Sequence, residues 1–207
     1  KRTGAAMVKI AMDLLRAGEI DEKTVLMRME PQKLDELLHP VFDKAALKHA
    51  KVVAKGLPAS PGAATGQVVF AADEAEAWAE KKKKVILVRI ETSPEDLRGM
   101  AVAQGILTMR GGMTSHAAVV ARGMGKCCVS GAGEIKVDYK EKTVEMGGNV
   151  YHEGDWISLN GSTGEVYNGQ VPTAEPEIGG DFGAIMNLAS KYTKTLVRTN
   201  ADSPRDA

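Results

Sequence analysis

The residues best suited to chemistry lie in one short segment, residues 110–123. Two glycines, Gly111 and Gly112, follow a run at 105–108 that predicts a short strand, and His116 opens an apolar, helix-forming run. Glycine allows a tight turn that exposes backbone N–H groups. The segment therefore predicts a strand, a glycine loop and a helix, with His116 in the first helical turn.

That position suits a nucleophile that carries an anionic group. Thr114 or Ser115 can cap the helix, and the free N–H groups and dipole at a helix start favour an anion. A histidine, with an ordinary pKa near ~6.5, is largely neutral at pH 7 and can accept a phosphoryl group covalently. We predict His116 as the phosphoryl acceptor. The residues predicted to contact or support the group are Arg110, Gly111, Gly112, Thr114, Ser115 and Arg122. A glycine turn before a capped helix with an idle histidine fits the same pattern.

The elements around this segment fall into distinct stretches. Residues 1 to about 50 predict short helices, and 55–66, with two prolines and three glycines, mark a boundary. Strands then alternate with helices, and the chain from Cys127 onward is mostly β until a helix at 182–192. The expected strands are 67–70, 85–90, 105–108, 136–138, 143–146, 156–159 and 164–167.

The composition excludes several classes of protein. The 207 residues hold 27 Lys and Arg against 27 Asp and Glu, and this balance argues against nucleic acid as the main partner. The sequence contains no apolar run near the ~18 residues of a membrane span, no recognisable signal peptide and no carboxylate cluster for a metal. Cys127 and Cys128 fit reduced strand residues in the cytoplasm, with a vicinal redox pair as the alternative.

The segment from Gly111 to Arg122 resembles the phosphohistidine signature of the phosphoenolpyruvate-utilising enzymes. Met113, and the continuation from Gly123 to Gly131, resemble the dikinase branch of that family, whereas the synthase and enzyme I branches typically have Arg at the Met113 position. The resemblance extends across the chain, through the boundary at 55–66 and the late hairpin at 154–167.

The resemblance implies an α/β fold: a swivelling phosphohistidine β/β/α domain with a small helical N-terminal segment and a C-terminal linker helix. It implies that residues 1–54 are a helical linker after a nucleotide-binding domain. Residues 55–178 are then the phosphohistidine domain. Residues 179–207 are a linker helix and the start of a barrel that binds phosphoenolpyruvate and pyruvate. We therefore expect the chain to be an excised piece of a longer protein.

The function implied is that of a carrier. His116 is pyrophosphorylated and phosphorylated from ATP and phosphate, and passes the phosphoryl group reversibly to pyruvate. The partners implied are the flanking domains of a parent that forms a homodimer. Mg²⁺ and a monovalent cation would belong to those domains, and Thr114 matches a threonine that is phosphorylated in plant dikinases. The alternatives are a synthase or enzyme I relative, and a non-catalytic docking module.

Overall fold

The structure, a computed structural model, describes residues 4–174 and 179–195. The chain divides into two compact units. One is the continuous stretch Leu38–Pro176, and the other combines Lys1–Leu37 with Glu177–Ala207. No helix in the described ranges is long and apolar enough to cross a membrane.

The smaller unit is helical and draws on both ends of the chain. Its core contains Val8, Val25 and Ile185, which come from three different helices. Lys191 Nζ donates to Glu22 Oε2 at 2.6 Å and so links the last helix to the second. The helices are α1 (Gly4–Arg16), α2 (Glu22–Met27), α3 (Pro31–Asp35), the 3₁₀ turn η1 (Glu36–Leu38) that runs to the next unit, and α8 (Gly180–Tyr192).

The larger unit is built on an eight-stranded mixed sheet in the order β2-β12-β11-β4-β5-β6-β7-β3. Its centre, β4 to β7, is parallel, and the remaining pairings are antiparallel. The strands are β2 (Val52–Lys55), β3 (Leu57–Ser60), β4 (Ala63–Val69), β5 (Val85–Arg89), β6 (Gly105–Thr108), β7 (Cys127–Ser130), β11 (Trp156–Asn160) and β12 (Glu165–Asn168).

The two edges of this sheet are joined by a single residue. β2 ends at Lys55 and β3 begins at Leu57, although the two strands lie at opposite edges. Consecutive Cα atoms are only ~3.8 Å apart, so the sheet must curl until its edges approach each other. The backbone N–H of Gly56 donates to the carbonyl of Gly164 at 2.8 Å and fastens this join.

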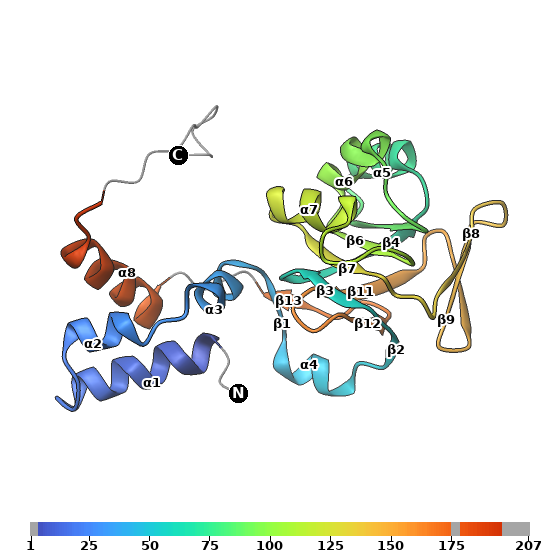
Figure 1. The fold of residues 1–207 in the computed structure, drawn as a ribbon. Helices are drawn as coiled ribbons and strands as arrows, with labels where there is room; N and C mark the ends of the chain where they lie inside the picture. Colours follow the sequence, from blue (N-terminus) through green and yellow to red (C-terminus); the bar gives the residue numbers. More distant parts are fainter. Residues whose placement is uncertain (1–3, 175–178, 196–207) are drawn as a thin grey trace. The chain divides into compact units, whose positions relative to one another are not determined.

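Helices cover one face of the sheet, as Figure 1 shows. Along β5, alternate side chains point to opposite faces. Val85 and Leu87 pack with the helices, and Ile86 and Val88 with the other layer. The helices are α5 (Ala72–Glu80), the turn η2 (Pro94–Asp96) with α6 (Leu97–Val102), and α7 (His116–Gly123).

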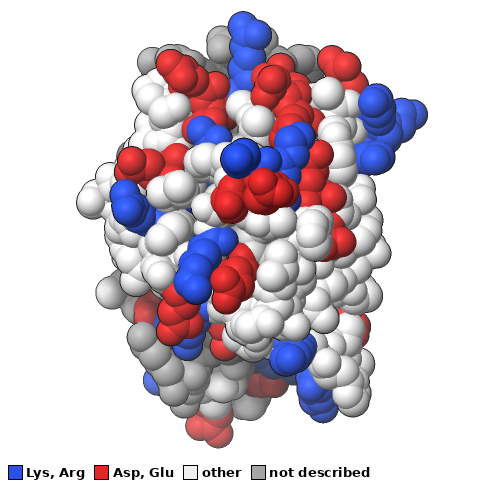
Figure 2. All heavy atoms as spheres, turned by 90° about the vertical axis from the view of Figure 1, so that its right-hand side faces the viewer, with Lys and Arg blue, Asp and Glu red and all other residues white. Residues whose placement is uncertain are grey.

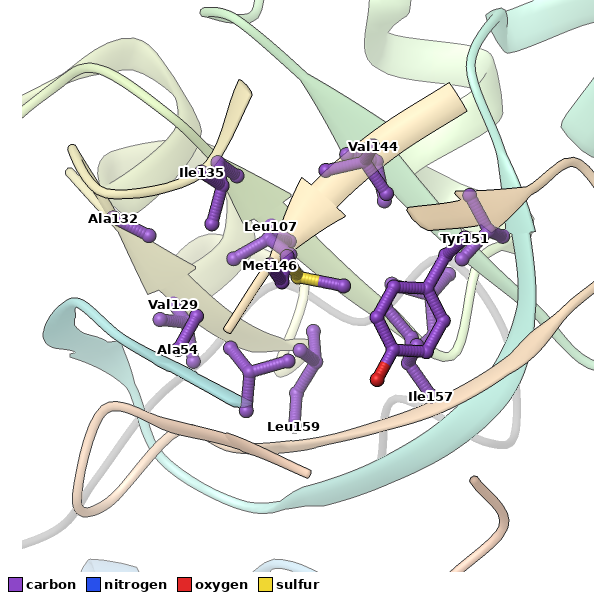
Figure 3. Packing of buried hydrophobic residues seen from close by; sticks show 14 of the residues in the cluster. Ala54, Leu107, Val129, Ala132, Ile135, Val144, Met146, Tyr151, Ile157 and Leu159 are labelled. Atoms are coloured by element: carbon purple, nitrogen blue, oxygen red, sulfur yellow. The ribbon is translucent and has the colours of Figure 1, made fainter. Parts of the chain in front are cut away.

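A three-stranded sheet provides the layer on the other face. Val144, Met146 and Tyr151 from its strands point toward Leu107 and Leu159 of the main sheet (Figure 3). The strands are β8 (Lys136–Asp138), β9 (Thr143–Met146) and β10 (Asn149–His152). The predicted α/β class and its β/β/α layering are therefore confirmed, with helical segments at both ends of the chain.

The boundary between the compact units lies between Leu37 and Leu38, whereas the composition of the sequence marks a boundary at 55–66. Residues 38–54 lie in the same compact unit as the sheet, because β1 (Val41–Phe42) pairs with β13 (Thr173–Ala174) and β2 pairs with β12. Only α4 (Lys44–His49) between them is helical. The assignment of 1–54, 55–178 and 179–207 to successive parts of a longer protein stays a prediction. The expected barrel start, 197–207, lies outside the described residues.

The surface of the β8–β9 side of the larger unit carries both signs of charge. Figure 2 shows Lys and Arg side chains interspersed with Asp and Glu over this face. Lys142, for example, forms ion pairs with both Glu74 and Glu153. This face therefore has no strip of uniform positive charge of the kind that a phosphate backbone requires.

Candidate functional site

The predicted site residues gather at the carboxyl edge of the parallel strands. Because β5, β6 and β7 are parallel, the loops that follow them meet at one edge of the sheet. Thr92 follows β5, the loop Arg110–Ser115 follows β6, and Ser130 is the last residue of β7. Three segments far apart in sequence thus supply one site.

Ser115, and not Thr114, caps the helix that carries His116. Its backbone is extended, and its Oγ accepts the N–H of Ala118 at 3.4 Å. The helix anchors itself through Ala117, Ala118 and Ala121, which are buried against the sheet. His116 is half-buried at the first position of the helix, as the sequence predicted.

The imidazole of His116 is held by Thr92. Its Nδ1 lies 3.0 Å from Thr92 Oγ1, and the threonine is only 8% exposed. Either atom can be the donor, depending on the tautomer of the ring. If Nδ1 carries the proton and donates it, Nε2 keeps the lone pair that a nucleophile needs.

The loop that carries Thr92 is itself fixed. The buried carboxylate of Asp96 accepts the backbone N–H of Ser93 at 2.9 Å and Arg89 Nε at 3.3 Å. The hydroxyl of Tyr139 accepts the N–H of Ile90 at 2.6 Å. Thr92 is not among the residues predicted from the sequence, because nothing local links it to a histidine 24 residues later.

Three hydroxyls lie in a row behind the helix start. Thr108 Oγ1 donates to Ser130 Oγ at 3.2 Å, and Ser130 Oγ lies 3.3 Å from Ser115 Oγ. Thr108 and Ser130 are fully buried. Neither residue is predictable from the sequence, because Thr and Ser are ordinary in strands and only the β6–β7 pairing brings them to Ser115.

Gly111 fits closely over these hydroxyls. Its φ is +114°, in the region that favours glycine, and an added Cβ would lie 2.9 Å from Ser130 Oγ and 3.0 Å from Ser115 Oγ. A Cβ on Gly112 would meet nothing within 4 Å. The two predicted glycines therefore differ. At position 111 a larger residue would clash with Ser115 and Ser130, whereas at position 112 there is room for a side chain.

The two predicted arginines also differ. Arg122 donates from Nη2 to the carbonyl of Met113 at 2.6 Å and from Nη1 to that of Ala59 at 3.4 Å, and so braces the loop. The exposed side chain of Arg110 makes no hydrogen bond or ion pair within the described ranges, so its donors are available to a ligand. The Thr114 side chain is likewise exposed and without a partner there.

The adjacent cysteines point to opposite faces of β7. Cys127 packs in the core shared with the three-stranded sheet, and Cys128 packs under the helices. Burial raises the pKa of the Cys127 thiol and raises that of Cys128 to about 12. Both thiols are free and buried, which fits structural residues and not a vicinal redox pair.

No group of three or more His, Cys, Asp or Glu side chains in the described part of the chain could hold a metal ion. The residues of the site are hydroxyls, arginines, backbone N–H groups and one imidazole. This donor set suits an oxyanion rather than a hard cation, which takes oxygen ligands from several carboxylates.

Comparison with known proteins agrees with this chemistry. Residues 81–164, which include His116 and its loop, match the family described as PEP-utilising enzyme, mobile domain. Pyruvate, phosphate dikinase of Clostridium symbiosum is 58% identical over 206 residues, and pyruvate, phosphate dikinase 2 of Zea mays is 56% identical over 207.

These relatives are much longer than the chain. The matches cover 100% of this chain but 24% and 23% of the two relatives, so the chain spans about a quarter of their length. A solution structure of Enzyme I is 22% identical, with a TM-score of 0.30. The match covers 53% of this chain and 37% of the Enzyme I chain. That likeness is too low to carry an argument.

Proposed function

Because the chain belongs to the phosphoenolpyruvate-utilising enzymes, we propose that it is the phosphoryl-carrier part of a pyruvate, phosphate dikinase, with His116 as the carrier residue. The observation that carries the proposal is the placement of His116. It begins a capped helix at the carboxyl edge of the sheet, with Nδ1 engaged by Thr92 and a set of hydroxyls behind it.

The chemistry at His116 is a reversible substitution at phosphorus. The Nε2 lone pair attacks, the N–P bond forms, and the P–O bond to the donor breaks, so the donor leaves with its electron pair. Nδ1 stays protonated throughout, and its N–H donates a hydrogen bond to Thr92 Oγ1. The N–H groups of the first helical turn and the guanidinium of Arg110 offer donors to the negative charge that arrives.

In the parent enzyme, His116 first takes the β,γ-pyrophosphoryl group of ATP. Inorganic phosphate then removes the terminal phosphoryl group. The phosphohistidine that remains transfers its group to pyruvate and gives phosphoenolpyruvate. Because the two substrates bind to different domains, the larger unit swivels between them. The reaction uses Mg²⁺, and a monovalent cation, held by the rest of the parent.

Three finer expectations belong to the same proposal. The parent is a homodimer, and it acts in the cytoplasm. Thr114 is a second modification site, where a regulatory enzyme phosphorylates the hydroxyl. The exposure of the Thr114 side chain supports this last point, since a modifying enzyme must reach the hydroxyl.

The proposal is tested in the parent enzyme with the substitution His116→Ala. We expect both half-reactions to disappear while the far-UV circular dichroism stays that of the wild type. A variant that retains either half-reaction would refute the carrier role and favour a docking module. The chain alone should show no overall turnover, and pyruvate-dependent ATP consumption by the pure chain would contradict the proposed division of labour.

A synthase relative is distinguished from a dikinase by its need for phosphate. In a dikinase, ATP-dependent labelling proceeds to phosphohistidine only when inorganic phosphate removes the terminal group. Formation of phosphohistidine from ATP in phosphate-free buffer would favour the synthase.

A further inference from the structure

The row of hydroxyls behind His116 has a definite direction. A serine or threonine hydroxyl has one proton to donate and two lone pairs to accept with. Thr108 Oγ1 donates its proton to Ser130 Oγ at 3.2 Å. Ser130 therefore enters the row as an acceptor, and its own proton must find another partner.

That partner is Ser115. Ser130 is fully buried, and Ser115 Oγ, at 3.3 Å, is the acceptor that the described residues offer its proton. The reverse orientation would leave the proton of Ser130 buried without an acceptor, which is costly in a protein interior. The low-cost arrangement is thus a chain of donation from Thr108 through Ser130 to Ser115.

The chain of donation fills both acceptor positions of Ser115. One lone pair accepts from Ser130, and the other accepts the N–H of Ala118 at 3.4 Å. The Ser115 proton is therefore left over, with no acceptor in the described part of the chain. Ser115 is half-buried and precedes His116 directly, so its proton is available at the start of the helix.

We propose that Thr108 and Ser130 are positioning residues that hold Ser115 as a hydrogen-bond donor to the phosphoryl group on His116. This inference rests on the proposed function, since it needs a phosphoryl group at that histidine. It assigns a role to two buried residues that do not themselves touch the group. Gly111 seals the row, because its backbone lies so close that a Cβ would meet both Ser130 Oγ and Ser115 Oγ.

The consequence can be measured on the phosphoryl group itself. A hydroxyl that donates to a phosphoryl oxygen stabilises the dianion and lowers the pKa of the group, which ordinarily lies near ~6. The 207-residue chain can be labelled with phosphoramidate: Nε2 attacks phosphorus, the N–P bond of the reagent breaks, and ammonia leaves. Titration followed by ³¹P NMR then gives the pKa of the phosphoryl group on His116.

We expect Ser130→Ala to weaken the acid dissociation of this phosphoryl group by about threefold to tenfold, because Ser115 then loses the hydrogen bond that holds its Oγ in place and polarises its hydroxyl as a donor. Thr108→Val should act in the same direction and less strongly. Ser60→Ala is the matched control, since Ser60 is 1% exposed on the neighbouring β3 and its Oγ has no partner within the described residues. It should leave the titration unchanged.

A double variant separates positioning from a general structural effect. If Ser130 acts through Ser115, then Ser130→Ala should add nothing in a Ser115→Ala background. The inference is overturned if Ser130→Ala titrates like the wild type, or if its effect persists without Ser115. Failure of phosphoramidate to label His116 would refute the proposed function and this inference together, whereas labelling with an unchanged Ser130→Ala titration refutes the inference alone.

Discussion

Two buried hydroxyl pairs bridge neighbouring strands of the same sheet, and they end differently. Thr65 and Ser158 pair across β4 and β11, and Thr108 and Ser130 across β6 and β7. All four residues are at most 5% exposed. The first pair lies in the antiparallel part of the sheet, and the second at the carboxyl edge of its parallel part.

The Ser158 network is closed by backbone groups. Ser158 Oγ lies 2.9 Å from Thr65 Oγ1 and 2.8 Å from the carbonyl of Gly169, and it accepts the N–H of Val171 at 2.9 Å. Thr65 Oγ1 lies 3.4 Å from the carbonyl of Ile157, which can take its proton. Every proton in this network has an acceptor in the fold, so its role is stability.

In the Ser130 network, one hydroxyl proton has no acceptor among the described residues. Its last member, Ser115, caps a helix and retains a donor for which the described residues supply no acceptor. The Ser158 network is satisfied within the fold, whereas the half-buried Ser115 keeps one donor that a ligand can take. The difference between the two networks is consistent with the site placed at His116.

The largest expected effect comes from a change that disrupts the Ser130 network. Gly111→Ala forces a side chain into a backbone with φ +114° and toward Ser115 and Ser130. We expect phosphoryl labelling of His116 to slow by about a hundredfold, since small displacements at a reacting centre have effects of that size. The free energy of unfolding should fall by about 1–3 kcal/mol.

The control for this variant is Gly133→Ala. Gly133 has no positive φ, and a Cβ there meets nothing within 4 Å. Labelling kinetics and urea unfolding of the two variants should differ clearly. Equal labelling rates for both variants would contradict the claim that the close packing of Gly111 on the Ser115 and Ser130 hydroxyls matters for labelling.

Thr92→Val tests the contact in front of the histidine. It removes the hydroxyl 3.0 Å from Nδ1 while keeping the volume of the side chain. The imidazole loses its fixed tautomer, and we expect labelling to slow by about tenfold, in the range of a lost positioning hydrogen bond. Thr92→Ser should restore most of the rate. The ¹⁵N shifts of the ring would show a mixture of tautomers in the valine variant, and unchanged shifts would argue against the assignment.

Ser158→Ala tests whether the Ser158 network contributes to stability alone. Removal of this hydroxyl leaves the N–H of Val171 buried without its acceptor, so the free energy of unfolding should fall by about 1–3 kcal/mol. Labelling of His116 should stay at the wild-type rate. A loss of labelling in a variant that remains folded would mean that both networks serve the site.

Local features of the sequence predicted much of the fold. The strand at 105–108, the glycine turn and the helix from His116 follow from short-range patterns, and the structure has all three. The strands β2 and β3 were missed, since only pairing with β12 and β7 identifies them. β3, with the sequence Leu-Pro-Ala-Ser, looks like part of a boundary loop, and β2 has only four residues.

The candidate site was predictable only in its contiguous part. His116, Gly111 and Ser115 stand within six residues, so spacing alone brings them together. Thr92 and Ser130 come from other strands, and only the register of the parallel sheet shows that they meet the helix start. The bracing role of Arg122 depends likewise on a loop geometry that no local pattern contains.

The most direct test of the account is to find where the phosphoryl group resides. The chain is incubated with labelled phosphoenolpyruvate and a partner fragment that carries the pyruvate-binding barrel, and the label is located by mass spectrometry under alkaline conditions. We predict an acid-labile phosphate on His116, on Nε2. A label on another residue, or none with a partner shown to be competent, would contradict the carrier role.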